Sequence, residues 1–198
     1  MYSAIAGATA CSSCAAGKYN ATAGAAAESD CMSCVPGKYS EIGSTACTDC
    51  AAGKFSIDIG APSAASCQLC PSGKYYSSTG ASACTDCGTG KYSTTHGSAN
   101  SNTCDSCAPG KASVATGATL ATTCVACTPG KYADQSGTNE CKDCAAGKQV
   151  STSGMKACTP CAAGRHASTN GTSECTQCEE GKYSDASGAA ANTTCQEC

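Results

Sequence analysis

Residues 124–144, CVACTPGKYADQSGTNECKDC, contain the pattern that decides the fold of this chain. A C-x-x-C pair stands at each end of the stretch. Between the two pairs, Gly130 is followed by a lysine and a tyrosine, and Gly137 stands seven positions further on. Because the same arrangement recurs throughout the sequence, it indicates a tandem array of small cysteine-rich modules.

The 22 cysteines all fall into eleven C-x-x-C pairs, and successive pairs start 16, 17 or 20 residues apart. Ten loops lie between the pairs, in a short class of 12 or 13 residues and a long class of 16. The long loops add three residues after the second glycine, and in VPGKYSEIGSTA at 35–46 the glycines are six apart instead of seven. We therefore predict ten tandem modules of 16–20 residues over 11–198, numbered 1–10 below, preceded by the tail of a truncated repeat over 1–10. The alternative is a start methionine on a degenerate first repeat.

Two columns of side chains follow the first glycine of each loop. Ten of the twelve basic residues occupy the first column, and an aromatic ring occupies the second in seven modules. We expect the rings to cover a disulfide or a glycine, and the basic residues to form a solvated row whose stems cover the rings. The alternatives are a ligand-stacking ladder of rings and an anion-binding track of cations. The basic column contains Lys18, Lys38, Lys54, Lys74, Lys91, Lys111, Lys131, Lys148, Arg165 and Lys182; the aromatic column contains Tyr19, Tyr39, Phe55, Tyr75, Tyr92, Tyr132 and Tyr183, and departs at Ala112, Gln149 and His166.

The composition excludes an ordinary globular core. Leu, Ile, Val and Phe together make up only 11 of 198 residues, so apolar burial cannot offset the conformational entropy lost on folding. Cysteine, at 22 of 198 residues, reaches the level of a disulfide scaffold and indicates an extracellular or cell-surface location. The net charge of −3 argues against nucleic-acid binding, and no apolar run approaches the ~18 residues that insert across a membrane.

Three N-x-S/T sequons fit the same location, and we predict covalent N-linked glycans at Asn20, Asn170 and Asn192. The loops that contain them have no apolar residues to bury, so they are expected at the surface. The Ser/Thr runs after the second glycine are expected to carry O-linked sugars.

These features predict a small disulfide-rich fold: an elongated rod of tandem short β-hairpin modules, with essentially no helix and no central hydrophobic core. The glycine columns suggest backbone at positive φ, and G-K-Y-S followed by a turn and a return toward cysteine is typical of a short hairpin. Such a hairpin is not stable alone, but a disulfide that closes a loop of about 15 residues adds roughly 3 kcal/mol. Because each module is too small to bury a shared interior, we expect it to contact only its neighbours.

The repeat favours one disulfide pairing, in which the second cysteine of each pair bonds the first cysteine of the next. Cys11 and Cys198 are then left as open ends. An interlocked pattern, Cys11–Cys31 with Cys14–Cys34, remains the alternative, since spacing alone does not fix connectivity. The favoured pairs are Cys14–Cys31, Cys34–Cys47, Cys50–Cys67, Cys70–Cys84, Cys87–Cys104, Cys107–Cys124, Cys127–Cys141, Cys144–Cys158, Cys161–Cys175 and Cys178–Cys195.

Metal binding and catalysis find less support. The spacing C-x2-C-x16-C-x2-C falls in the range of four-cysteine zinc sites, but the loops do not alternate between two kinds, and the 12-residue gap fits poorly. Thiol redox chemistry requires one C-x-x-C near a βαβ pattern rather than eleven in a glycine-rich array. The only histidines, His96 and His166, have no fixed Cys, Ser or Asp companion. We therefore predict no catalytic residue, no metal, no cofactor and no enzyme activity.

The recurring pattern C-x-x-C-x-x-G-K-Y-S…G…C resembles the ephrin-receptor-like cysteine-rich repeat along the whole chain. That family is related to the first half-module of tumour-necrosis-factor-receptor domains and to growth-factor-receptor cysteine-rich regions. The resemblance implies an extracellular rod of small disulfide-bonded β modules, with each loop closed by its own disulfide and no catalytic residue. Such repeats occur in receptor ectodomains and in long surface proteins.

Two functional hypotheses follow from the uniform modules. The first is a structural segment of a secreted or cell-surface fibrous glycoprotein, which assembles with further copies of the same repeat into an extracellular filament or appendage. The second is a receptor or adhesion stalk that binds a protein partner, which requires a few individual modules with exposed anchor residues. The candidates for such individuality are modules 8 and 9, with Gln149-Val150 and Arg165-His166.

Overall fold

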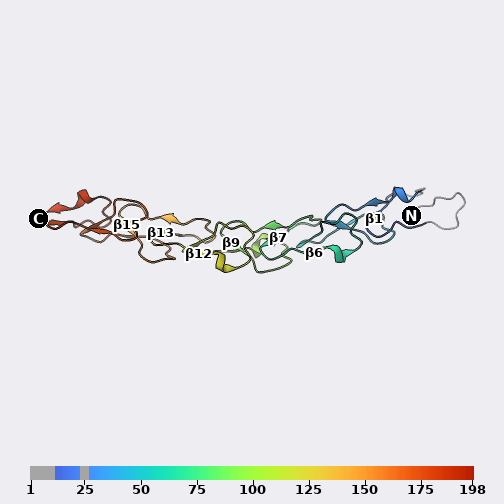
Figure 1. Ribbon diagram of the computed structural model, residues 1–198, viewed down its shortest axis with the longest axis horizontal. Helices are drawn as coiled ribbons and strands as arrows, with labels where there is room; N and C mark the ends of the chain where they lie inside the picture. Colours follow the sequence, from blue (N-terminus) through green and yellow to red (C-terminus); the bar gives the residue numbers. More distant parts are fainter. Residues whose placement is uncertain (1–11, 23–26) are drawn as a thin grey trace. The chain divides into compact units, whose positions relative to one another are not determined.

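Ten antiparallel hairpins, one per predicted module, contain the paired strands of the described residues. The computed structural model describes residues 12–22 and 27–198 (Figure 1). Within these ranges every strand is two residues long. The first strands are β1 Lys18–Tyr19, β3 Lys38–Tyr39, β5 Lys54–Phe55, β7 Lys74–Tyr75, β9 Lys91–Tyr92, β11 Lys111–Ala112, β13 Lys131–Tyr132, β15 Lys148–Gln149, β17 Arg165–His166 and β19 Lys182–Tyr183.

The return strand of each hairpin lies inside a C-x-x-C pair. In module 7, for example, Lys131 pairs with Asp143 and Tyr132 pairs with Lys142, the two residues between Cys141 and Cys144. Each pair of cysteines therefore serves two modules, because it closes one loop, supplies that hairpin's return strand and opens the next loop. The return strands are β2 Met32–Ser33, β4 Thr48–Asp49, β6 Gln68–Leu69, β8 Thr85–Asp86, β10 Asp105–Ser106, β12 Val125–Ala126, β14 Lys142–Asp143, β16 Thr159–Pro160, β18 Thr176–Gln177 and β20 Gln196–Glu197.

The three additional residues of each long loop form a single 3-10 turn immediately before the closing cysteine. The amide of that cysteine donates to the carbonyl three residues earlier, as from Cys67 to Ala64 at 3.2 Å. In the described residues these turns are the only helical structure, which agrees with the prediction of essentially no helix. They are η1 Glu28–Asp30, η2 Ala64–Ser66, η3 Ser101–Thr103, η4 Ala121–Thr123 and η5 Asn192–Thr194.

The chain divides into two compact units, Met1–Cys87 with Ser93–Cys104 and Gly88–Tyr92 with Asp105–Cys198. Each unit shows the same contacts between consecutive modules. In the first unit, Gly37 N–H donates to the carbonyl of Ser56 in the next module at 2.8 Å. In the second, Gly130 N–H donates to Val150 at the same distance. Consecutive modules are thus joined by backbone hydrogen bonds as well as by the chain.

Alternate modules also touch, which makes the expectation of contacts between neighbours alone wrong. A β-carbon built on Gly37 of module 2 would lie 2.2 Å from the carbonyl oxygen of Gly80 in module 4. The same relationship in the second unit joins Gly130 of module 7 to Gly171 of module 9, at 2.1 Å. Because glycine lacks a side chain, two backbones can pack directly against each other over these positions.

Disulfides and small residues take the place of a hydrophobic core. Cys34, Cys50 and Cys70 are fully buried, and the largest fully buried side chains in the described residues are cysteines and serines. The third residue after the first glycine is also buried in nine modules, as at Ser40, whereas Tyr76 of module 4 is half-buried. The carbonyl of Ser40 accepts from Gly17 of the preceding module. Most large aliphatic residues lie outside, and Ile59 is 74% exposed; Val150 is the buried exception in the described residues. This arrangement agrees with the predicted small disulfide-rich fold without a central core.

Candidate functional site

Ten disulfides in the described residues join the second cysteine of each pair to the first cysteine of the next. This is the pairing favoured by the repeat, and the interlocked alternative is wrong because Cys14 bonds Cys31 while Cys34 bonds Cys47. Sulfur–sulfur distances run from 1.90 to 2.06 Å and Cα–Cα distances from 5.5 to 5.8 Å. The remaining pairs are Cys50–Cys67, Cys70–Cys84, Cys87–Cys104, Cys107–Cys124, Cys127–Cys141, Cys144–Cys158, Cys161–Cys175 and Cys178–Cys195.

The structure describes one of the two predicted open ends, Cys198, but not the other. Cys198 is an exposed free thiol. Cys11 lies outside the described residues. Its role as an open end therefore stays a prediction.

The basic column lies at the surface, and three of its lysines pair with an aspartate directly across the hairpin. These pairs are Lys38–Asp49, Lys74–Asp86 and Lys131–Asp143. The hydrogen bond from Lys38 holds the pKa of Asp49 below its ordinary value, and the bond to Asp143 raises the pKa of Lys131. Exposed ion pairs of this kind contribute little to stability. The aspartates partly neutralise the charge of these three lysines, which argues against the alternative of an anion-binding track.

Two rings of the aromatic column line a hollow together with the closing cysteine of the next module. Phe55 of module 3 lines a hollow with Cys84, which closes module 4, and Tyr132 of module 7 lines another with Cys158, which closes module 8. In module 8 the column residue is Gln149, whose Oε1 accepts from the amide of Cys175. The sequence predicted rings over a disulfide; in modules 3 and 7 the ring and a cysteine of the next module's disulfide line the same hollow.

A larger hollow lies in module 6, where Ala112 replaces the ring. Its volume is about 360 Å³, compared with about 190 Å³ beside Phe55 and about 140 Å³ beside Tyr132. Val114 and Val125 line it, and they are 80% and 66% exposed. Alanine and valine supply five of its lining residues, so the missing ring leaves a depression with a largely apolar wall.

The residues proposed as individual anchors in modules 8 and 9 are largely internal. Val150 is 4% exposed and His166 is 9% exposed, while Gln149 is half-buried. Arg165 donates to the carbonyl of Cys175 at 3.0 Å across its own hairpin. These side chains therefore serve contacts within the array. The sequence shows the ring-to-alanine change at Ala112, but no site was predicted there.

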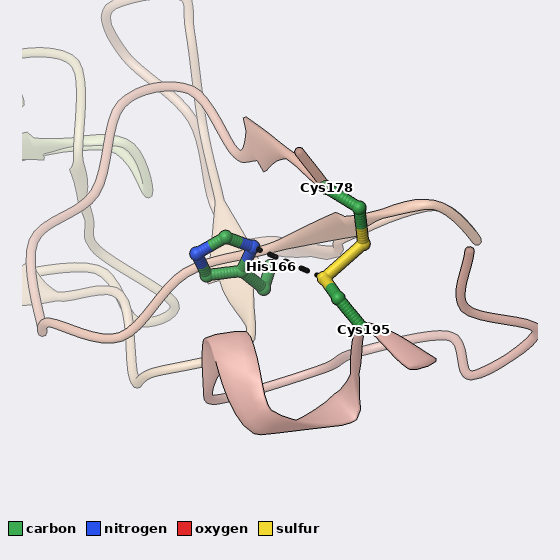
Figure 2. A group of neighbouring side chains, drawn as sticks. All are labelled: His166, Cys178 and Cys195. Atoms are coloured by element: carbon green, nitrogen blue, oxygen red, sulfur yellow. Dashed lines mark hydrogen bonds between the residues drawn. A yellow bond between two sulfur atoms is a disulfide. The ribbon is translucent and has the colours of Figure 1, made fainter. Parts of the chain in front are cut away.

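One cluster brings together residue types that bind metals. The Nδ1 atom of His166 lies 3.8 Å from Cys195 Sγ, and these atoms and Cys178 Sγ all lie within 4.8 Å of one another (Figure 2). Cys178 and Cys195 share a disulfide, however, so their sulfurs are not the thiolates that metals bind. The second histidine, His96, is exposed and lies on a different part of the chain.

The three sequons differ in accessibility. Asn170 and Asn192 are exposed. Asn20 is 5% exposed, its Oδ1 accepts from the amide of Thr22 at 2.8 Å, and its Nδ2 is buried. A glycan attaches through Nδ2, so the fold favours attachment at Asn170 and Asn192 over Asn20.

Tandem hairpin modules, each closed by its own disulfide, define the chain as a cysteine-rich repeat array. Residues 37–87, which include modules 3 and 4 and most of module 2, match the family described as tyrosine-protein kinase ephrin type A/B receptor-like. This match and the ten disulfides indicate an extracellular, receptor-like repeat region. No curated protein matches the chain. In the part of the chain that the structure describes, none of the helical segments has the length and hydropathy to cross a membrane.

Proposed function

We propose that the chain is a structural repeat segment of a secreted or cell-surface fibrous glycoprotein, which assembles with further copies of the same repeat into an extracellular filament or appendage. One observation carries the proposal. At eight junctions in the described residues, the amide of a second glycine donates to the carbonyl of the preceding module's opening cysteine, at 2.7–2.9 Å. Because only glycine and cysteine backbone takes part, the same junction can be repeated without a specialised surface.

The disulfides suit such a segment to mechanical load. Each one closes a single module, so a force along the chain reaches the loop only after the covalent link is cut. Local opening then stays within one module and its contacts, whereas a thin hydrophobic core would open cooperatively. The elongated rod predicted from the sequence is part of this proposal.

Covalent glycans complete the proposed surface. Asn170 and Asn192 are both exposed, so a glycan on either would extend from the surface. We expect both to be occupied in material secreted by a eukaryotic host, with lower occupancy at Asn20. Glycopeptide mapping measures this, and unmodified Asn170 and Asn192 in native material would remove glycans from the proposal.

The alternative is a receptor or adhesion stalk that binds a protein partner. The hollow beside Ala112 favours this function, because it is larger than the hollows beside Phe55 and Tyr132 and so distinguishes module 6 from modules 3 and 7. Exposed Val114 and Val125 at its edge provide apolar contact area for a partner.

The two functions are separated by the state of oxidised, secreted material. We expect light scattering to show a mass that rises with protein concentration, and electron microscopy to show fibres in which the segment repeats along the axis. A fixed monomer mass across the accessible concentration range would exclude the filament and leave the stalk. The same sample tests the rod, since small-angle scattering distinguishes an extended particle from a compact one.

A further inference from the structure

The side chain of His166 meets a disulfide of the neighbouring module. His166 lies on β17 in module 9, and the disulfide is Cys178–Cys195, which closes module 10. Figure 2 shows the imidazole directed at Cys195, with Nδ1 3.8 Å from Sγ. His166 is 9% exposed, and both cysteines are half-buried rather than fully buried.

The chemistry of this contact differs from that in the other modules. His166 occupies the aromatic column, where seven modules carry Tyr or Phe and the other two carry Ala112 and Gln149. Alanine has no proton to give, and Gln149 reaches the backbone amide of Cys175 instead of a sulfur. An imidazole that carries its proton on Nδ1, as one neutral tautomer and the cation both do, can donate to sulfur.

We propose that His166 makes Cys178–Cys195 an exchange-labile disulfide, at which a small thiol or a thiol on a partner attaches covalently to the array. Thiol–disulfide exchange is fast when the departing sulfur is stabilised as a thiolate. Here the stabilised sulfur is Cys195 Sγ, because it is the atom that His166 contacts.

The exchange step balances without any further oxidant. A thiolate attacks Cys178 Sγ, the Cys178–Cys195 bond breaks, and its electron pair leaves on Cys195 Sγ, which receives the hydrogen bond or proton from His166 Nδ1. The products are a mixed disulfide on Cys178 and a free thiol on Cys195. A second thiolate can then attack the mixed disulfide, which releases the oxidised thiol dimer and leaves both cysteines reduced.

Opening this link has a limited structural effect. The disulfide closes module 10 alone, and the junction to module 9, Gly188 N–H to the Cys161 carbonyl at 2.8 Å, uses the backbone of residues outside the pair. Cys161 is held by its own disulfide to Cys175. The array therefore gains one place for covalent attachment while the preceding modules keep their links.

The other nine disulfides serve as internal controls in one experiment. Fully oxidised chain is incubated with reduced glutathione, samples are alkylated at intervals, and peptide mapping follows each disulfide. We expect Cys178–Cys195 to open about tenfold faster than the other nine, with glutathione on Cys178 rather than Cys195. In His166→Tyr, which restores the usual column residue, we expect its rate to fall into the range of the other nine.

Exposure of module 10 is the competing explanation, and a second variant separates it from the imidazole. Tyr132 of module 7 occupies the same column position and lines one hollow with Cys158 of module 8, so Tyr132→His is expected to accelerate opening of Cys144–Cys158. The proposal is overturned if His166→Tyr leaves the Cys178–Cys195 rate unchanged, or if Tyr132→His leaves the Cys144–Cys158 rate unchanged. Retention of the other eight disulfides in each variant shows that the fold is intact.

Discussion

The carbonyl oxygen of Gly154 lies 2.0 Å from the position that a β-carbon on Gly110 would occupy. The two glycines belong to modules 6 and 8, so alternate modules meet backbone to backbone. Gly110 also has φ of 87°, a conformation that side chains disfavour. The glycine is therefore required twice, once for its own backbone conformation and once for the approach of Gly154.

These two requirements can be separated by a pair of substitutions. Gly164 has φ of 77° and no atom within 4 Å of an added β-carbon, so Gly164→Ala carries the conformational cost alone, about 1–2 kcal/mol. Gly110→Ala adds a steric overlap, and we expect a further loss of about 1–3 kcal/mol. Thermal unfolding of the oxidised variants measures both. Equal losses would mean that the Gly110–Gly154 approach does not contribute to stability.

The hairpins and the disulfide pairing could be predicted because both follow from periodicity. A basic residue, followed by an aromatic one in seven modules, stands in every module at the position of Lys131 after the C-x-x-C pair. A loop that is uniform in this way can be closed in the same way each time. The contact between alternate modules could not be predicted, since a backbone that packs on backbone leaves no side-chain pattern. The first glycine of each loop was its only trace, and a turn at positive φ explains that glycine equally well.

The candidate sites were only partly readable for a related reason. Sequence singles out Ala112, Gln149 and His166 as departures from one column, but it does not show which atoms that column faces. The structure places the column against the next module, so Ala112 leaves a hollow, Gln149 binds a backbone amide and His166 meets a sulfur. The fate of a side chain in such an array depends on the sequence one module further along.

Filling the hollow in module 6 is expected to stabilise the array. Ala112→Tyr places a ring where Phe55 and Tyr132 lie in other modules, and partial burial of that ring contributes about 1–2 kcal/mol. Tyr132→Ala is the matched reverse change, and we expect it to lower stability by a similar amount. Thermal unfolding compares the two variants with the parent chain. A loss of stability in Ala112→Tyr would show that the hollow cannot accommodate a ring.

The ion pair of module 2 predicts a defined response to acid. The hydrogen bond from Lys38 lowers the pKa of Asp49 below 3.8, so the pair stabilises the folded chain above that pH. This contribution is lost as the pH falls through the folded-state pKa. In Lys38→Gln we expect the pKa of Asp49 to rise toward 3.8, as measured by NMR titration of its carboxyl carbon. An unchanged titration would mean that Lys38 does not hold the carboxylate.

Removal of one disulfide is expected to open a limited stretch of the array. The double variant Cys127→Ala/Cys141→Ala loses the constraint on a loop with a separation of 14 residues, which costs about 3 kcal/mol. Module 8 depends on this loop, because Gly154 N–H donates to the Cys127 carbonyl at 2.8 Å. Module 9 depends on it through the approach of Gly171 to Gly130. Amide hydrogen exchange should therefore accelerate at Gly154 and Gly171.

Module 10 provides the boundary of that effect. The amide of Gly188 donates to the Cys161 carbonyl, which lies in module 9 and keeps its own disulfide to Cys175. We expect Gly188 to keep most of its protection in the variant that lacks Cys127–Cys141. The matched variant Cys107→Ala/Cys124→Ala has nearly the same loop-closure cost, at a separation of 17 residues. In this variant we expect accelerated amide exchange at Gly137, because its amide donates to the Cys107 carbonyl. Protection lost throughout the chain in either variant would show that the array unfolds as one cooperative unit. Protection lost in the altered module alone would show that contacts between alternate modules carry no stability, because those contacts are what should extend the opening by two modules and no further.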